Sequence, residues 1–256
     1  MNRIEKRDEF LAAEVKELVL EIGYAECKVV ETATDKIVVE AILDEENADR
    51  YSCTLADGVL KVDASKANKT ISLTDTKKSA WEKQELTITV PYDMELEDLE
   101  LCVGAGTAKL ENVSTKYDKA KIEVGAGKLD VMTLTVANHI HAELGAGAVD
   151  IQNMTAKTAN VECGVGRMVV KGAVESDIKA ECGVGSLEMQ LDAVESDYNY
   201  DIDCGLGSVL INGSKRGGWF ASKADMVNAG AKGNMKLECG IGRIELVTQK
   251  RISAEA

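Results

Sequence analysis

Two neighbouring segments of the sequence carry the same ten-residue pattern: Val161-Glu-Cys-Gly-Val-Gly-Arg-Met-Val-Val170 and Ala180-Glu-Cys-Gly-Val-Gly-Ser-Leu-Glu-Met189. In both, apolar residues recur at every second position on either side of a Gly-x-Gly step. A period of two indicates half-buried strands, whose side chains point alternately to opposite faces. We expect the glycines to mark a tight corner, where the chain turns without a Cβ in the way.

The Gly-x-Gly step recurs seven times along the chain and accounts for 14 of the 22 glycines. Successive steps are 21, 20, 19, 19, 22 and 35 residues apart, so the last interval is one repeat plus an insertion. One such unit cannot bury its own apolar face, whereas units stacked one on the next build a continuous core. The predicted corner residues are Gly104, Gly106, Gly125, Gly127, Gly145, Gly147, Gly164, Gly166, Gly183, Gly185, Gly205, Gly207, Gly240 and Gly242.

The sequence therefore predicts an all-β fold, a single-chain β-solenoid of stacked 19–22-residue coils with an N-terminal β cap. We assign residues 96–256 to the seven-coil solenoid, with an insertion at about 212–234, and residues 1–95 to N-terminal strands that cap it. These strands are antiparallel or solenoid-like, and the whole is one continuous domain. Residues 2–13 are expected to form a short helix or to be disordered.

The chain resembles a known family in the segment Leu86-Thr-Ile-Thr-Val-Pro-Tyr-Asp-Met-Glu-Leu-Glu-Asp-Leu-Glu-Leu101 and in the tandem Gly-x-Gly coils that follow it. It is similar to the bacterial DUF4097 family, which is labelled adhesin-like, and especially to members from Gram-positive anaerobes with recurring Cys-Gly-[IVL]-Gly coils. The resemblance covers roughly residues 14–247. It implies a β-solenoid and a setting in the cell envelope, and it brings no catalytic residues.

The composition excludes several classes of partner. Acidic residues outnumber basic ones by 44 to 30, a net charge of −14, which argues against nucleic acid and against an anionic membrane surface. No apolar stretch approaches the ~20 residues of a membrane span, so we expect no membrane insertion by this segment. A protein or glycan remains as the partner. The resemblance implies an extracytoplasmic location, and a cytoplasmic one is expected if Met1 is the native start.

Four of the seven cysteines occupy one position of successive coils, immediately before the first glycine: Cys163, Cys182, Cys204 and Cys239. Earlier coils place Val103, Val124 and Leu144 there, so the position accepts an apolar side chain. Buried cysteine behaves as a small apolar residue, and no C-x-x-C spacing occurs. We favour a core cysteine column over a metal-binding row of thiolates.

Acidic residues form two columns of outward positions. The first contains Glu123, Glu143, Glu162, Glu181, Asp203 and Glu238, and the second contains Asp130, Asp150, Glu188 and Glu245. Oxygen ligands of this kind suit calcium, but the Gly-Gly-x-Gly-x-Asp calcium repeat is absent, so we favour a solvated face.

His139 and His141 could chelate a metal as an H-x-H pair, but no third ligand is visible, so we favour the interpretation that both are surface residues.

The insertion contains basic and aromatic residues close together, and we single out Lys215, Arg216, Trp219 and Phe220 as a binding loop. Long loops on rigid scaffolds often carry binding residues. In the alternative, Trp219 and Phe220 fold back to plug the C-terminal end of the core, because an exposed end of a stack needs covering. We favour the plug.

Two functions remain from different classes. The first is a non-enzymatic binding or scaffold module of the bacterial cell envelope, adhesin-like in role. The alternative is a solenoid-type enzyme acting on polysaccharides, which needs paired carboxylates in a groove rimmed by long loops. The short coils leave little room for such a groove. We therefore expect no enzyme, no catalytic residues, no metal site and no cofactor.

Overall fold

The computed structural model describes residues 3–65, 84–111, 113–217 and 222–249. These residues form 23 strands and three short 3-10 helices, and pairing links all 23 strands into one sheet. The all-β prediction is therefore confirmed. The 3-10 helices are η1 (Ala12–Glu14), η2 (Glu45–Arg50) and η3 (Glu195–Asp197).

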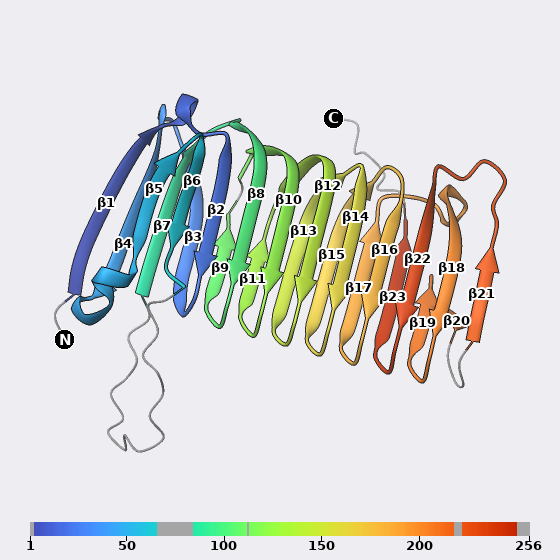
Figure 1. The fold of residues 1–256 in the computed structure, drawn as a ribbon. Helices are drawn as coiled ribbons and strands as arrows, with labels where there is room; N and C mark the ends of the chain where they lie inside the picture. The colour runs from blue at the N-terminus through green and yellow to red at the C-terminus, as the bar shows by residue number, and fades with distance from the viewer. Residues whose placement is uncertain (1–2, 66–83, 112, 218–221, 250–256) are drawn as a thin grey trace, which may run out of the picture.

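The sheet winds back on itself into two long walls joined along one edge by a row of tight corners (Figure 1). We call the wall whose strands run into these corners the leading wall. In spatial order it consists of β5 (Ser52–Ala56), β6 (Val59–Asp63), β2 (Glu17–Ile22), β8 (Glu95–Val103), β10 (Lys116–Val124), β12 (Leu134–Leu144), β14 (Thr158–Cys163), β16 (Ile178–Cys182), β22 (Gly233–Cys239), β18 (Tyr198–Cys204) and β21 (Ser222–Met226).

The opposite wall, whose strands leave the corners, is the trailing wall. In spatial order it consists of β1 (Arg3–Leu11), β4 (Lys36–Asp44), β7 (Gln84–Pro91), β3 (Ala25–Thr32), β9 (Thr107–Leu110), β11 (Lys128–Val131), β13 (Ala148–Ala156), β15 (Arg167–Val174), β17 (Ser186–Leu191), β23 (Arg243–Thr248), β19 (Ser208–Ile211) and β20 (Ser214–Gly217).

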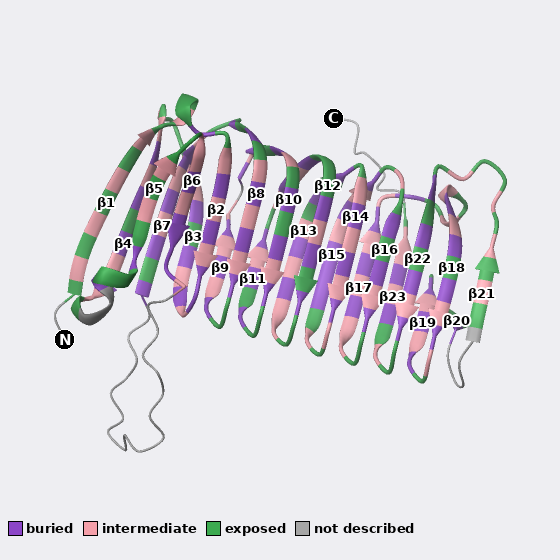
Figure 2. Cartoon of the chain, viewed as in Figure 1, coloured by how far each residue is buried: buried purple, intermediate pink, exposed green. Residues whose placement is uncertain are grey.

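A leading strand and the trailing strand that follows it make one coil, and neighbouring coils pair in parallel and in register. Ile122 of β10, for example, lies opposite Leu101 of β8 on one side and Ala142 of β12 on the other. All three side chains are buried, and burial alternates along the strands throughout the stack (Figure 2). The buried residues form one continuous apolar cluster that runs from Val15 to Leu246. The fold is thus solenoid-like, and each fully buried aliphatic side chain stabilises it by ~1.5–3 kcal/mol.

The corners are close enough to one another that they require glycine. The amide nitrogen of Gly125 donates to the carbonyl oxygen of Val103 at 2.8 Å, and that of Ala126 donates to Gly104 at 2.8 Å. A Cβ added at Gly147 would overlap the carbonyl oxygen of Gly127 in the neighbouring coil. The structure places all fourteen predicted corner glycines in one row along this edge.

The order of the coils in space differs from their order in the sequence at the C-terminal end. The last coil, β22–β23, lies between β16–β17 and β18–β19, so Cys239 has Cys182 on one side and Cys204 on the other. We expected each coil to stack on the one that follows it in the sequence, and the sixth and seventh coils are exchanged. Both orders bury the same rows of apolar side chains, so the pattern alone does not distinguish them.

The N-terminal region repeats this arrangement. Strands β2 and β3 pair in parallel with β8 and β9 on one side and with β6 and β7 on the other. Their corner is Gly23-Tyr24-Ala25, in which alanine replaces the second glycine. Within residues 1–95, β2, β3, β6 and β7 are therefore solenoid-like and continue the stack.

Antiparallel strands lie at both ends of the stack. At the N-terminal end, β4 pairs with β7 and β1, and β5 pairs with β6. Residues 3–11, within the segment expected to be a short helix or disordered, form strand β1. Strand β1 alternates between exposed and half-buried residues, which is a strand pattern with no helical period. At the C-terminal end, β20 and β21 pair with β19 and β18.

Candidate functional site

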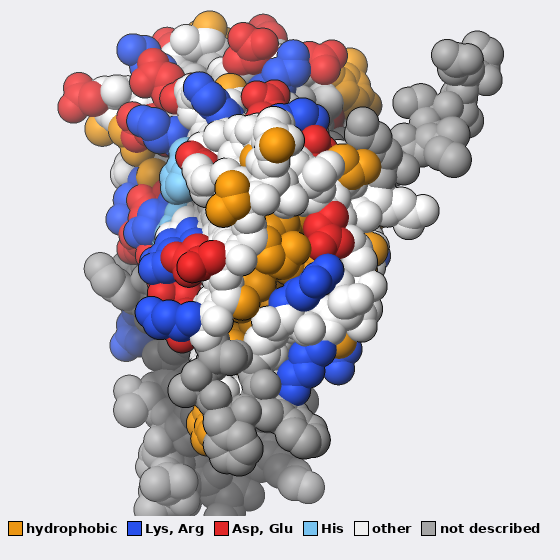
Figure 3. Space-filling model, turned by 90° about the vertical axis from the view of Figure 1, so that its right-hand side faces the viewer, with side chains coloured by type: hydrophobic (Ala, Val, Ile, Leu, Met, Phe, Trp, Pro, Cys, Tyr) orange, Lys and Arg blue, Asp and Glu red, His pale blue; other side chains and the backbone are white. Residues whose placement is uncertain are grey.

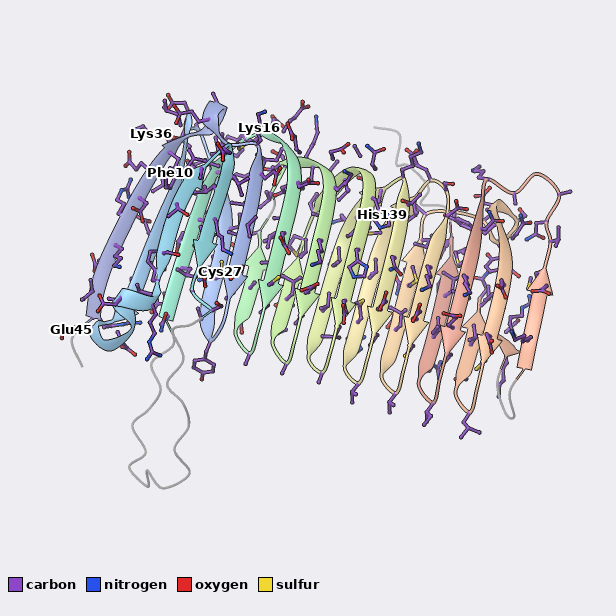
Figure 4. The ribbon with its side chains drawn as sticks, in the orientation of Figure 1. Phe10, Lys16, Cys27, Lys36, Glu45 and His139 are labelled. Carbon is purple, nitrogen blue, oxygen red and sulfur yellow. The ribbon has the colours of Figure 1, made fainter. Side chains whose placement is uncertain are left out.

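Four large aliphatic side chains project into solvent from consecutive corners. They occupy the middle position of Gly-x-Gly, and their exposed fractions are 65% for Val165, 56% for Val184, 63% for Ile241 and 68% for Leu206. Hydrogen bonds between corner backbones link these coils in that spatial order. We call these four residues the corner strip, and Figure 4 shows side chains projecting from this row of corners. The repeat alignment treats the middle position as a spacer, so sequence reasoning missed them.

The next corners along the same row carry small side chains. Ala105, Ala126 and Ala146 take the middle position, and all three are exposed. An exposed aliphatic residue at this point therefore adds nothing that the turn needs. A single exposed apolar residue is ordinary, but a contiguous row of them marks an interaction surface.

A column of carboxylates runs along the leading wall beside the corners. In spatial order this acidic column is Glu123, Glu143, Glu162, Glu181, Glu238 and Asp203, and each residue lies opposite the next in the strand register. The column was expected, and the structure places these residues together on the outer face. The exchange of the last two coils puts Glu238 between Glu181 and Asp203.

Three of these six carboxylates pair with a lysine two residues earlier on the same strand. Lys121 contacts Glu123 at 2.7 Å, Lys236 contacts Glu238 at 2.8 Å, and Lys179 forms an ion pair with Glu181. The hydrogen bonds from Lys121 and Lys236 hold the pKa values of Glu123 and Glu238 below the ordinary value.

The other three positions of the column have different partners. Glu143 lies 3.9 Å from Nε2 of His141. Glu162 instead accepts a hydrogen bond from the amide of Asn160 at 3.0 Å. The partner of Asp203 is Lys223 of the edge strand β21, at 3.2 Å. Asn160 places no positive charge beside Glu162. The negative charge of the column is therefore neutralised to different extents along its length.

A shallow hollow of about 300 Å³ lies between the acidic column and the corner strip. Glu181, Glu238 and Asp203 line it on one side, together with the Cys182–Gly183 and Cys239–Gly240 segments. Val184 and Ile241 directly follow these two glycines. The lining of the hollow therefore ends one residue before two members of the corner strip.

The four cysteines of the predicted column lie inside the stack, beneath the corner strip. Their spatial order is Cys163, Cys182, Cys239 and Cys204, and all four are buried with free thiols. The thiol of Cys182 donates to the carbonyl oxygen of Gly185 at 3.2 Å, and that of Cys239 donates to Gly242 at 3.1 Å. Burial raises the pKa of Cys204 to about 11.

His139 and His141 lie on the outer face of β12, and His139 is labelled in Figure 4. Nδ1 of His139 lies 2.8 Å from the hydroxyl of Thr158, and Nδ1 of His141 lies 3.1 Å from the amide nitrogen of Asn160. Across residues 3–65, 84–111, 113–217 and 222–249, no group of three or more His, Cys, Asp or Glu side chains is arranged to hold a metal ion.

Only part of the predicted binding loop lies within the described residues. Lys215 and Arg216 belong to the edge strand β20, and the guanidinium of Arg216 contacts Glu195 at 2.9 Å. Arg216 thus holds the edge strand to the 3-10 helix η3. Trp219 and Phe220, and with them the predicted plug, lie outside the described residues. Figure 3 shows hydrophobic side chains at the centre of this end of the molecule.

The model of the Toastrack DUF4097 family matches residues 15–225 of the chain. The chain belongs to this family. The match includes every coil except β22–β23, which begins at Gly233, beyond the matched residues. The family resemblance noted in the sequence is therefore confirmed.

A solved structure supports the same fold. A "putative adhesin" from Bacteroides fragilis is 15% identical, with a TM-score of 0.50, and the match covers 95% of this chain and 97% of that one. A "putative cell adhesion protein" from Clostridium sporogenes is 16% identical over 97% of this chain and 100% of that one, with a TM-score of 0.37. No curated protein matches the chain. In the described part of this Toastrack chain, no helix is long and apolar enough to cross a membrane.

Proposed function

We propose that the chain is a non-enzymatic binding or scaffold module of the bacterial cell envelope, adhesin-like in role. In this proposal the stack is a β-solenoid whose N-terminal strands β1, β4 and β5 cap one end. Its partner is a protein or a glycan, and it neither binds nucleic acid nor inserts into a membrane. The similar structure from Bacteroides fragilis is named a "putative adhesin", and this name supports an adhesive role.

One observation carries the proposal: the carboxylates form a row along the outer face of the sheet and do not face one another across a cleft. Carboxylates of the acidic column stand side by side in strand register, and three of the six, Glu123, Glu181 and Glu238, pair with lysines of their own strands. A glycosidase instead needs two carboxylates facing one another across a substrate, ~5–10 Å apart. The hollow beside the column is open and shallow, and its three carboxylates lie on one wall.

Two measurements on the purified chain test the proposal. The chain is sedimented with the envelope fraction of a bacterium that encodes it, and the bound fraction is compared with that for the cytoplasmic fraction. Separately, a panel of bacterial polysaccharides is incubated with the chain and assayed for new reducing ends. We expect co-sedimentation with the envelope and no new ends.

The same measurements define the outcome that overturns the proposal. New reducing ends that disappear in the Glu181→Gln/Glu238→Gln variant would establish the polysaccharide-acting enzyme in its place. If the chain stays in the supernatant with every envelope preparation, the proposal that it is a binding module of the envelope is wrong.

A further inference from the structure

We propose that the corner strip and the acidic column beside it form a docking surface for a basic amphipathic helix of a partner protein. This inference rests on the proposed function as a binding module and names the chemistry of its partner. The surface comprises Val165, Val184, Ile241 and Leu206, with Glu162, Glu181, Glu238 and Asp203 along one flank.

The apolar half of the surface has no role in the fold. Each strip side chain is more than half exposed, and the alanine corners of the same row turn equally well. Strand spacing of ~4.8 Å places the four side chains along ~14 Å. Helical residues at i, i+3/i+4 and i+7 rise by 4.5–6 Å per step, so an apolar helix face follows the same line of contacts.

The two flanks of the strip differ in charge. On the trailing wall, Arg167 and Arg243 are already paired with Glu188 and Glu245, at 3.2 and 2.6 Å. On the leading wall, Glu162 lies beside an amide. The hollow next to Val184 and Ile241 is lined by three carboxylates, whereas the lysines that pair with them, Lys179, Lys236 and Lys223, do not line it. A helix lying in this hollow would place lysine or arginine against the acidic column while its apolar face packs on the strip.

Charge argues against two other occupants. An anionic bilayer would meet the acidic column and a net charge of −14, and both repel it. A second copy of the chain would bring another strip of only four side chains, which together expose a few hundred Å², well below the ~1,000 Å² of a stable interface. A basic helix satisfies both the apolar and the charged part of the surface.

The probe is a fluorescent helix of ~18 residues with leucines at i, i+3, i+4 and i+7 and lysines elsewhere. A second peptide has glutamate in place of lysine, and a third has the lysine composition in scrambled, non-amphipathic order. We expect the lysine helix to bind with a Kd of ~10 µM and the other two at least tenfold more weakly. We also expect the affinity to fall at high salt.

Matched variants locate the site. Val184→Ser/Ile241→Ser and Glu181→Gln/Glu238→Gln should each weaken binding of the lysine helix at least tenfold. The control is Val227→Ser, because Val227 is 86% exposed and lies outside the strip. Circular dichroism and melting temperature confirm that each variant is folded, as expected for exposed positions.

Several outcomes would overturn the inference. These are equal binding of the glutamate helix, unchanged binding by the strip variant, or no binding of the lysine helix at all. Strip-dependent binding to phosphatidylglycerol vesicles without binding of the helix would assign the strip to lipid. A strip-dependent dimer in sedimentation velocity would assign it to a second copy. If the chain still sediments with the envelope while the helix fails to bind, only this inference falls and the proposed function stands.

Discussion

The seven Gly-x-Gly coils divide into two regions. The regions differ at two positions that change together: the residue before the first glycine and the middle residue of the corner. In the alanine region, coils with Val103, Val124 or Leu144 beneath the corner have an alanine at the exposed middle position of the corner. In the cysteine region, the four coils with cysteine beneath the corner have valine, leucine or isoleucine at that position. Strand pairing and burial are the same in both regions, so neither choice is needed to make a coil. The inner residue must fit the space beneath the corner of the neighbouring coil. The outer residue is exposed, so its side chain can contact a partner.

The inner space is narrow in both regions. Cγ1 of Val103 lies 2.9 Å from where a Cβ on Gly127 would stand, and Sγ of Cys182 lies 2.7 Å from the corresponding point on Gly242. The thiol also donates to the corner carbonyl of Gly185, which a hydrocarbon side chain cannot do. Cysteine therefore fills the space and adds a weak hydrogen bond to the corner.

The largest effect should come from closing a corner in the alanine region. Gly147→Ala places a Cβ onto the carbonyl oxygen of Gly127, and backbone on both sides must move. We expect the free energy of unfolding to fall by about 3 kcal/mol or more, measured by urea denaturation. Gly183→Ala, at the first glycine of a corner in the cysteine region, is the control, because its Cβ would lie 3.1 Å from the nearest atom, and it should cost about 1 kcal/mol. Equal losses would mean that corner spacing does not set the glycine requirement.

Exchanging the inner residues tests the space beneath the corners. Leu144→Ala leaves a cavity and should cost ~2–5 kcal/mol. Cys182→Leu adds volume against Gly242 and should cost ~1–3 kcal/mol through overpacking. Thermal and urea unfolding of both variants gives the comparison. A more stable Cys182→Leu protein would contradict the narrow fit and imply an unfilled space beneath the cysteine corners.

Thiol labelling separates the inner position from the outer one. Cys102 stands one residue before Val103, so it faces outward, half-buried, with its thiol 3.6 Å from a carboxylate oxygen of Glu123. We expect Cys102 to react with a small disulfide reagent at least ~100-fold faster than Cys163, Cys182, Cys204 and Cys239, because those thiols are exposed only by opening of the coils. Mass spectrometry of partly labelled protein measures this, with denatured protein as the reference. Rapid labelling of Cys182 would place its thiol outside the core.

Much of the fold was predictable because the period is local. The inward rows, the corners and the cysteine column follow from alternation around Gly-x-Gly, and they lie as expected. The order of the last two coils was not predictable, because β22 presents the same apolar row to β16 and to β18. The Gly23-Tyr24-Ala25 corner was missed because alanine breaks the motif, although alternation before it marked the strand.

The candidate site was less predictable for a physical reason. The middle residue of each corner is exposed because all the corners line up along one outer edge of the stack. The period-two pattern of the strands does not reveal this alignment. The signal was the change from alanine to valine, leucine or isoleucine between the two regions. Arg216 was singled out for its charge, but its ion pair with Glu195 joins segments whose proximity follows from the edge strand β20.

The smallest effect should come from the ion pairs, of which Lys121–Glu123 lies in the alanine region and Lys236–Glu238 in the cysteine region. The pKa of Glu123 is lowered chiefly by the hydrogen bond from Lys121, so this pair stabilises the fold above the unfolded pKa of ~4.3. That contribution is lost as the pH falls through the lower, folded pKa. Lys121→Met should therefore reduce the free energy of unfolding at pH 7 and differ less from the parent below about pH 4.

The size of that difference is limited by exposure. Both side chains of the pair are more than a third exposed, so the loss at pH 7 should be below ~1 kcal/mol and should shrink in high salt. Lys236→Met, which frees Glu238 in the cysteine region, is the comparison variant. Because Lys121 also pairs with Glu100 at 3.3 Å, Lys236→Met should give a slightly smaller loss with the same direction of pH dependence. Urea denaturation of the three proteins between pH 3 and pH 7 measures both. A clearly larger loss for Lys236→Met would mean that the carboxylates beside the corner strip repel one another more strongly than those beside the alanine corners. The two regions would then differ in charge as well as in their apolar surface.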